Sequence, residues 1–202
     1  KIKFYTDLWH ALLGRRIVSD IDGKYLDMTG ETPVTRQSPL DKKGNPWPHY
    51  NFDALWGSHW SLNILWSMVY PEVMDGFCNT MVSMYENGGL IPRGPSGGNY
   101  TYVMIGDPAT SFFATAYNKG IRNYDVAKAY EGLRKNAFVG GIRDHAGYEH
   151  ESPAFGGGMD YYVQQGWIPE RIKAKGGHKD GCAMTLEYAY QDWCLAQLAA
   201  NL

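Results

Sequence analysis

The 202-residue sequence has few cysteines, no long apolar run and no excess of charge of one sign. Its three cysteines, Cys78, Cys182 and Cys194, are too few and too far apart for a disulfide framework or a paired-cysteine metal site. Nineteen Lys and Arg against 21 Asp and Glu give a formal charge of −2, without the basic excess that binding to a phosphate backbone requires. No apolar stretch approaches the roughly 18 residues of a membrane span, and no signal-peptide pattern is present. Nucleic acid and a membrane span are therefore not expected.

Glycine and aromatic residues are abundant instead. The 24 glycines exceed the roughly 7% of an average protein, which implies many tight turns. Seven Trp and 15 Tyr contribute most of the aromatic content. Indole and phenol rings combine an apolar face with a polar edge, so they suit hydroxyl-rich ligands such as sugars as well as ordinary cores.

Apolar residues recur with helical spacing along most of the chain, which predicts an all-α fold of successive helical hairpins with long loops. Pro71 suits the first turn of one helix, and Asp125 is a candidate N-cap for another. Long loops are expected at 19–52 and 139–157, where function is often located. The expected helices are 4–13, 55–69, 72–87, 108–119, 125–138, 158–165 and 184–202.

The sequence is expected to be a piece of a longer protein. Apolar helical spacing is already under way at Phe4, and the final helix runs to Leu202 without a glycine or proline stop. We therefore expect residues 1–202 to form a single partial domain. Three expected helices end in Gly88, Gly120 and Gly166, where glycine takes the left-handed cap conformation at little cost.

Three short patterns suggest catalytic or metal sites, and each has a simpler interpretation. Gly94-Pro95-Ser96-Gly97-Gly98 fits the G-x-S-x-G elbow of serine hydrolases, but that elbow needs a preceding strand, which the nearby prolines disfavour. Asp20-Ile21-Asp22-Gly23 lacks the third oxygen ligand of a calcium loop, so a turn is favoured. His145, Glu149 and His150 match neither H-E-x-x-H nor a zinc knuckle, which favours a solvated loop.

The segment Leu55-Trp56-Gly57-Ser58-His59-Trp60-Ser61 opens the helix expected after the first long loop. On a helix, Trp56 and Trp60 lie on one face because residues four apart are neighbours. Two interpretations stay open. Either this face packs into the core, or it lines a pocket and stacks on a sugar.

Six segments, taken in order, resemble glycoside hydrolase family 92, the calcium-dependent exo-acting alpha-mannosidases. The two most specific in residue type and spacing lie at 84–92 and 185–194. The six are Phe4-Tyr5-Thr6 with Leu8-Trp9-His10, Ser19-Asp20-Ile21-Asp22-Gly23-Lys24-Tyr25, Leu55-Trp56-Gly57, Met84-Tyr85-Glu86-Asn87-Gly88-Gly89-Leu90-Ile91-Pro92, Ala116-Tyr117-Asn118-Lys119-Gly120-Ile121-Arg122 and Thr185-Leu186-Glu187-Tyr188-Ala189-Tyr190-Gln191-Asp192-Trp193-Cys194.

The resemblance implies a beta-sandwich followed by a ring of six helical hairpins, an (α/α)6 toroid of which this chain would be about the first half. It also implies inverting hydrolysis of a mannose-containing or related glycan, with a glutamic acid as proton donor, an aspartate activating water, and calcium at the sugar. The motifs for the acid, the base and most of the calcium shell lie downstream of residue 202. We therefore expect no catalytic residue and no metal ligand in this chain, and no activity from it without the rest of the polypeptide. A secreted or periplasmic location is implied.

The sequence departs from the family pattern at the expected sugar-binding wall. Where many members read Trp-Asp-Thr, an aromatic residue and Arg, this chain reads Trp56-Gly57-Ser58-His59-Trp60, so a carboxylate and a guanidinium are missing. Ligand contacts are expected from Trp56, His59 and Trp60, with Arg93 and Asp107 behind them. Glu187 and Asp192 are expected to brace loops. Two alternatives stay open, a non-catalytic carbohydrate-binding relative and a serine hydrolase using Ser96.

Overall fold

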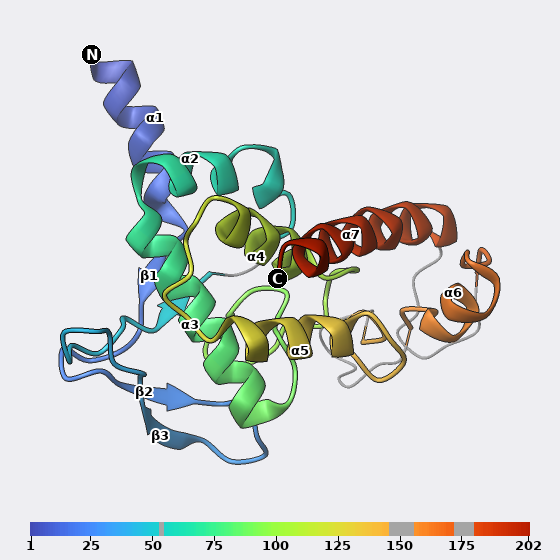
Figure 1. Ribbon diagram of the computed structural model, residues 1–202, viewed down its shortest axis with the longest axis horizontal. Helices are drawn as coiled ribbons and strands as arrows, with labels where there is room; N and C mark the ends of the chain where they lie inside the picture. Colours follow the sequence, from blue (N-terminus) through green and yellow to red (C-terminus); the bar gives the residue numbers. More distant parts are fainter. Residues whose placement is uncertain (53–54, 146–155, 172–179) are drawn as a thin grey trace.

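The computed structural model describes residues 1–52, 55–145, 156–171 and 180–202, and these are mainly helical (Figure 1). Expected helices are found in all seven places, although their ends differ. The α-helices are α1 (Ile2–Leu13), α2 (Leu62–Val69), α3 (Pro71–Gly88), α4 (Pro108–Asn118), α5 (Val126–Asn136), α6 (Met159–Gln165) and α7 (Gly181–Asn201).

The hydrophobic core lies where α3 and α4 pack against α2, α5 and α7. Trp66 of α2 stacks on Phe77 of α3, with ring centroids 5.3 Å apart, and Phe77 meets Phe112 of α4 edge to face at 6.0 Å. All three side chains are fully buried. Burial of such a ring stabilises the fold by about 2–3 kcal/mol, so this stack fixes how the central helices cross.

Two predicted helix starts are confirmed. Pro71 stands in the first turn of α3, where a missing backbone N–H costs nothing. The Asp125 side chain caps α5 by accepting a hydrogen bond from the backbone N of Lys128 at 2.9 Å.

The end of α3 differs from the expectation by one residue. Gly88 is helical, and Gly89 takes the left-handed conformation with φ of +85°. A Cβ at Gly88 would collide with the Tyr100 hydroxyl and with Thr29. Gly88 therefore permits close packing, while Gly89 turns the chain.

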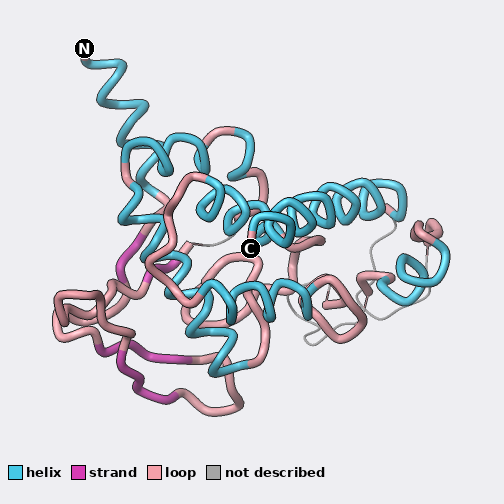
Figure 2. Tube along the Cα trace, in the orientation of Figure 1, coloured by secondary structure: helices cyan, strands magenta, loops and turns pink. Residues whose placement is uncertain are grey.

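The expectation of an all-α chain is wrong between residues 16 and 51, where two small antiparallel pairs form (Figure 2). One pair joins β1 (Arg16–Ile17) to β4 (Tyr50–Asn51), and the other joins β2 (Lys24–Asp27) to β3 (Val34–Gln37). The β2–β3 pair is held by Arg36, whose Nε donates to the buried Asp27 carboxylate at 2.8 Å. In β2 the buried position 27 is a carboxylate, and every residue of β3 is exposed. Neither strand therefore shows the alternation of apolar and polar residues by which a strand is recognised.

The single helix expected over 55–69 is interrupted. Gly57 has a left-handed φ of +78°, a conformation that an α-helix cannot contain. A short 3-10 turn, η1 (Ser58–Trp60), follows, and α2 begins only at Leu62. Trp56 and Trp60 therefore do not share a helical face, although their ring centroids are 6.2 Å apart.

Helix α1 projects from the body and buries none of its side chains within the described residues (Figure 1). Of the long loop expected at 139–157, residues 146–155, with Glu149 and His150, lie outside the described residues. A search of the described helices finds none with the length and apolarity needed to cross a bilayer.

Candidate functional site

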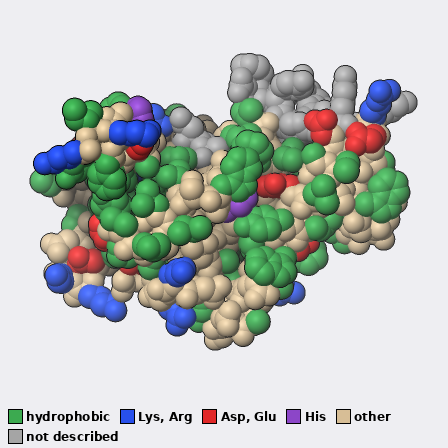
Figure 3. All heavy atoms as spheres, turned by 90° about the horizontal axis from the view of Figure 1, so that it is seen from above, with side chains coloured by type: hydrophobic (Ala, Val, Ile, Leu, Met, Phe, Trp, Pro, Cys, Tyr) green, Lys and Arg blue, Asp and Glu red, His purple; other side chains and the backbone are tan. Residues whose placement is uncertain are grey.

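Five ring side chains form a strip that joins η1 to α7, here called the aromatic strip and made of Trp56, Trp60, His59, Tyr190 and Trp193. Successive ring centroids are 6.2 Å apart from Trp56 to Trp60, 5.7 Å from Trp60 to His59, 4.9 Å from His59 to Tyr190 and 6.4 Å from Tyr190 to Trp193. Figure 3 shows the face of the molecule that carries α2 and α7, where hydrophobic side chains gather around a histidine. Rings from two distant segments thus make one surface.

Trp56, which lies just before η1, and Trp60, which ends it, are not core residues in the described part of the chain. Trp56 is 51% exposed and Trp60 is 72% exposed. Partial burial lowers the pKa of His59, so its imidazole is neutral near pH 7 and offers one donor and one acceptor. Flat apolar faces beside a neutral polar ring are complementary to the C–H faces and hydroxyls of a sugar.

Tyr190 and Trp193 were missed by the sequence analysis. They are three residues apart on α7, so they share one helical face. Only tertiary contact between α7 and η1 places them beside His59, and no local pattern contains that contact. Their spacing of three residues was the sequence signal that could have indicated a shared helical face.

Arg93 is fully buried behind this surface, and its guanidinium is committed to backbone carbonyls. It donates to the carbonyls of Gly106 at 2.8 Å, Thr101 at 3.2 Å and Ile142 at 2.6 Å. Burial lowers the pKa of Arg93 to about 10, which leaves it charged at neutral pH. The predicted ligand contact of Arg93 is untested, and its observed position is that of a brace within the α3–α4 connection and between that connection and the segment after α5.

Asp107, which precedes α4, is also fully buried. Its Oδ2 accepts a hydrogen bond from Thr110 Oγ1 at 2.7 Å, and its backbone N donates to Gln191 Oε1 at 2.7 Å. Burial raises the pKa of the Asp107 carboxyl, against the opposing effect of Arg143. Asp107 therefore links the start of α4 to α7 from behind the surface.

The two carboxylates expected to brace loops behave differently. Asp192 accepts hydrogen bonds from Arg143 Nη1 at 2.5 Å and from the Tyr162 hydroxyl at 2.9 Å, so it joins α7 to α6 and to the segment after α5. Among the described residues, the Glu187 carboxylate makes no hydrogen bond to another loop. Its Oε1 accepts a hydrogen bond at 2.7 Å from Gln191, on the same helix.

The remaining sequence motifs have the local structures of turns. Ser96 pairs with Asn99 in a tight turn, without the strand before and the helix after it that a nucleophile elbow requires. The Asp22 carboxylate is occupied by Lys24 at 2.6 Å. Over the described ranges, no three His, Cys, Asp or Glu side chains are grouped as metal ligands would be.

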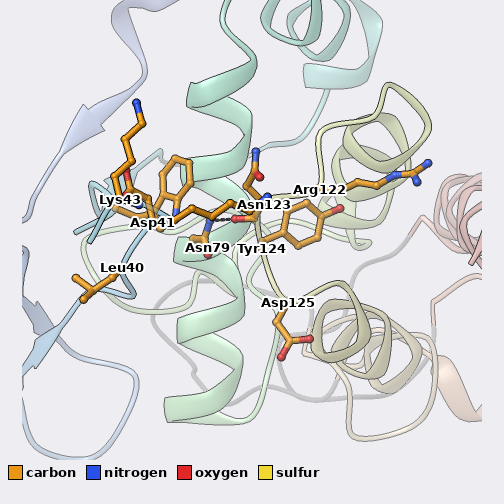
Figure 4. A pocket seen from close by; sticks show the side chains of 10 residues that line it. Leu40, Asp41, Lys43, Asn79, Arg122, Asn123, Tyr124 and Asp125 are labelled. Carbon is orange, nitrogen blue, oxygen red and sulfur yellow. Dashed lines mark hydrogen bonds between the residues drawn. The ribbon is translucent and has the colours of Figure 1, made fainter. Parts of the chain in front are cut away.

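A separate pocket of about 470 Å³ lies between the segment 40–47 and the connection from α4 to α5 (Figure 4). Two of its polar side chains are already engaged. Asn79 donates to the Asn123 carbonyl at 2.9 Å, and Arg122 points away to lie over the Tyr117 ring at 3.8 Å. None of the predicted ligand-contact residues lines this pocket.

Comparison with known proteins connects this chain to one family. The model of the glycosyl hydrolase family 92 catalytic domain matches residues 1–202. The GH92 alpha-mannosidase BT3965 from Bacteroides thetaiotaomicron, solved alone and in complex with mannoimidazole, shares 25% sequence identity at a TM-score of 0.73, covering 98% of this chain and 23% of that chain.

A second similar structure is the GH92 inverting mannosidase BT2199 from Bacteroides thetaiotaomicron VPI-5482, with 27% identity, a TM-score of 0.69, and coverage of 98% of this chain and 24% of that chain. Our chain thus spans about a quarter of the length of these neighbours. Among curated protein sequences, none matches it.

Proposed function

Because this chain belongs to glycosyl hydrolase family 92, we propose that the full-length protein is an exo-acting alpha-mannosidase that hydrolyses mannose-containing or related glycans with inversion. The match over all of residues 1–202 carries this proposal. The neighbours support it, since one is named an inverting mannosidase and another is solved with mannoimidazole. In the full-length protein, this chain would form part of the wall of the substrate site and would support that wall from behind.

We further propose that residues 1–202 are about half of an (α/α)6 toroid, and that the rest of the polypeptide supplies a beta-sandwich and the second half. Consecutive packed helices from α2 to α5, with α7 against α4, support such an arrangement. The general acid and base would lie downstream of residue 202, so this chain without them would be inactive. A secreted or periplasmic location is proposed on the family resemblance.

In this proposal the chain's own residues bind and orient the sugar. Trp56 and Trp60 offer apolar faces to sugar C–H groups and exclude water from them. The neutral His59 donates and accepts hydrogen bonds with hydroxyls. Holding the glycosidic bond in place is what allows a carboxylic acid on one side and a carboxylate-activated water on the other to act together.

Calcium dependence is proposed for the full-length protein with its ligands mostly outside this chain. The part of the chain that the structure describes offers no ligand set for such a hard cation, which takes six to eight oxygen ligands. No step is therefore assigned to calcium through residues 1–202. When bound, the ion would polarise sugar hydroxyls and favour the distorted ring of the transition state.

The alternative function is carbohydrate binding without catalysis. It is favoured by the sequence of residues 56–60, where Gly57 and its neighbours include no carboxylate and no guanidinium. The deciding experiment incubates full-length protein with alpha-linked mannobioses and follows the released anomer by NMR, with and without a chelator. Release of beta-mannose that a chelator stops supports the enzyme. Binding without release supports the alternative, and neither binding nor release overturns both.

A further inference from the structure

We propose that Glu187 is a sugar-binding carboxylate at the edge of the aromatic strip, and that Gln191 is the positioning residue that holds it there. This inference rests on the proposed glycan site and adds two residues to it. It reverses the bracing role expected for Glu187 from sequence.

The geometry begins with Gln191, whose side chain is 1% exposed and makes two hydrogen bonds in opposite directions. Its Oε1 accepts from the backbone N of Asp107 at 2.7 Å, and its Nε2 donates to Glu187 Oε1 at 2.7 Å. The amide is therefore locked to the start of α4 and fixes one oxygen of Glu187. No hydrogen-bond partner of Oε2 is found among the described residues, so this oxygen is available to a ligand.

Gly106 fixes the same carboxylate from the other side. Its φ of +76° already favours glycine, and a Cβ there would lie 2.9 Å from Glu187 Cγ and 2.6 Å from Gln191 Nε2. Its carbonyl is held by Arg93 at 2.8 Å. Glu187 thus packs directly against a backbone turn that cannot shift easily.

Glu187 differs from Asp107 and Asp192 in being partly exposed while having no cationic hydrogen-bond partner among the described residues. Asp107 is fully buried, and Asp192 is paired with Arg143. Glu187 lies three residues before Tyr190 on α7, and Tyr190 contacts His59. A half-buried carboxylate beside aromatic rings forms charge-assisted hydrogen bonds to sugar hydroxyls, which are roughly twice as strong as neutral ones.

The ionisable groups around Glu187 decide its pH response. They are Arg143 from the segment after α5, and Tyr188, Tyr190 and Cys194 on α7. Burial raises the pKa of Glu187, while the Gln191 hydrogen bond and Arg143 lower it. Removing the Gln191 donor should therefore raise this pKa further, so that ligand binding by the carboxylate is lost at a higher pH as the solution is acidified.

The test compares full-length wild type, Glu187→Gln, Gln191→Met and Gln191→Glu, with mannobiose affinity by calorimetry and kcat/KM from pH 4 to 9. Glu187→Gln should weaken affinity and raise KM about tenfold or more, with little change in kcat. Gln191→Met should move the acidic limb of kcat/KM to higher pH. Gln191→Glu keeps an acceptor for the backbone N–H of Asp107 but loses the donor to Glu187. It should therefore shift the acidic limb of kcat/KM to higher pH by at least as much as Gln191→Met does.

The control is Gln197→Met, the same substitution at an exposed position on the same helix, which should behave as wild type. Unchanged affinity and KM in a folded Glu187→Gln protein would overturn the assignment of Glu187. A Gln191→Met protein whose pH profile is unmoved would overturn the positioning role. If the wild type binds mannobiose without hydrolysing it, the proposed enzymatic function is contradicted. Calorimetry on wild type and Glu187→Gln then still tests whether Glu187 binds the sugar.

Discussion

His59 and Tyr190 lie with their ring centroids 4.9 Å apart at an interplanar angle of 39°, although more than half of the sequence separates them. This contact joins η1 to α7 at the surface. It brings Trp56, Trp60 and the face of α7 that carries Tyr190 to one surface, the candidate site.

Replacing Trp60 with alanine should reduce kcat/KM for an alpha-mannoside by ten- to a hundredfold in full-length protein. A sugar covering about 100 Å² of the indole contributes roughly 2.5 kcal/mol, which this variant loses. Because Trp60 is largely exposed, the melting temperature should stay unchanged. Trp167→Ala is the matched control, since Trp167 is 52% exposed and lies after α6. Equal activities of both variants would argue against a sugar at the aromatic strip.

Arg93→Met should destabilise the full-length protein by roughly 3–5 kcal/mol, measured by urea denaturation. Two buried carbonyls and one partly buried carbonyl lose their donor, and each unsatisfied buried group costs about 1–3 kcal/mol. Arg122→Met is the control, because Arg122 is exposed, and it should cost less than 1 kcal/mol. A stable Arg93→Met protein with a raised KM would instead support direct ligand contact.

Gly106→Ala should cost about 1–3 kcal/mol of stability and also weaken glycan binding. Its Cβ would push on both Gln191 and Glu187, in addition to the strain of a positive φ. Gly120→Ala provides the comparison, because Gly120 has a φ of +80° with open space around its Cβ. Calorimetry should therefore show lost affinity for the first variant alone. Matching affinities would mean that Gly106 does not support the site.

The segment carrying β2 and β3 should lose stability on acidification because of His49. Burial lowers the pKa of His49 to about 4, below its ordinary value near 6.5. Because the pKa of His49 is lower in the folded state than in the unfolded state, the stability contributed by the neutral imidazole is complete above pH 6.5. Roughly 3 kcal/mol of that stability is lost as the pH falls from about 6.5 to 4.

His49→Phe should keep the ring stack on Tyr25, whose centroid lies 3.6 Å from that of His49, and remove this acid sensitivity. Hydrogen exchange of residues 24–37 at pH 7 and pH 4 measures the effect. His10→Phe, at an exposed position of α1, should retain the wild-type pH response. An unchanged pH response in His49→Phe would assign the acid sensitivity to other groups.

The helices could be predicted from sequence because their signals are local. Pro71 and the Asp125 cap act within one turn of the helix that they start. The strands could not be predicted, since the buried Asp27 carboxylate is paired with Arg36 of the partner strand, a contact that no local pattern contains. The left-handed conformation of Gly57 likewise leads into η1, which packs against α2 and α4, and a glycine alone does not indicate that packing.

The site was predictable where its residues are sequence neighbours. Trp56, His59 and Trp60 were predicted to lie together because they are neighbours in sequence, and their rings do lie close to one another. Glu187 and Asp192 could not be told apart, because the difference between them is the distant Arg143. Burial of Arg93 could not be predicted either, since arginine is rarely fully buried and one of its three acceptors, Ile142, comes from a distant segment after α5.

The three acceptors of Arg93 are main-chain carbonyls, which every amino acid possesses. Residues 101 and 142 can therefore change identity without breaking these bonds, provided that the backbone keeps its course. The hydrogen bonds of this guanidinium can therefore hold the loops at the same spacing even when the loop side chains differ. Relatives with a different sugar preference could thus vary the side chains on these loops and inherit an unaltered scaffold beneath them.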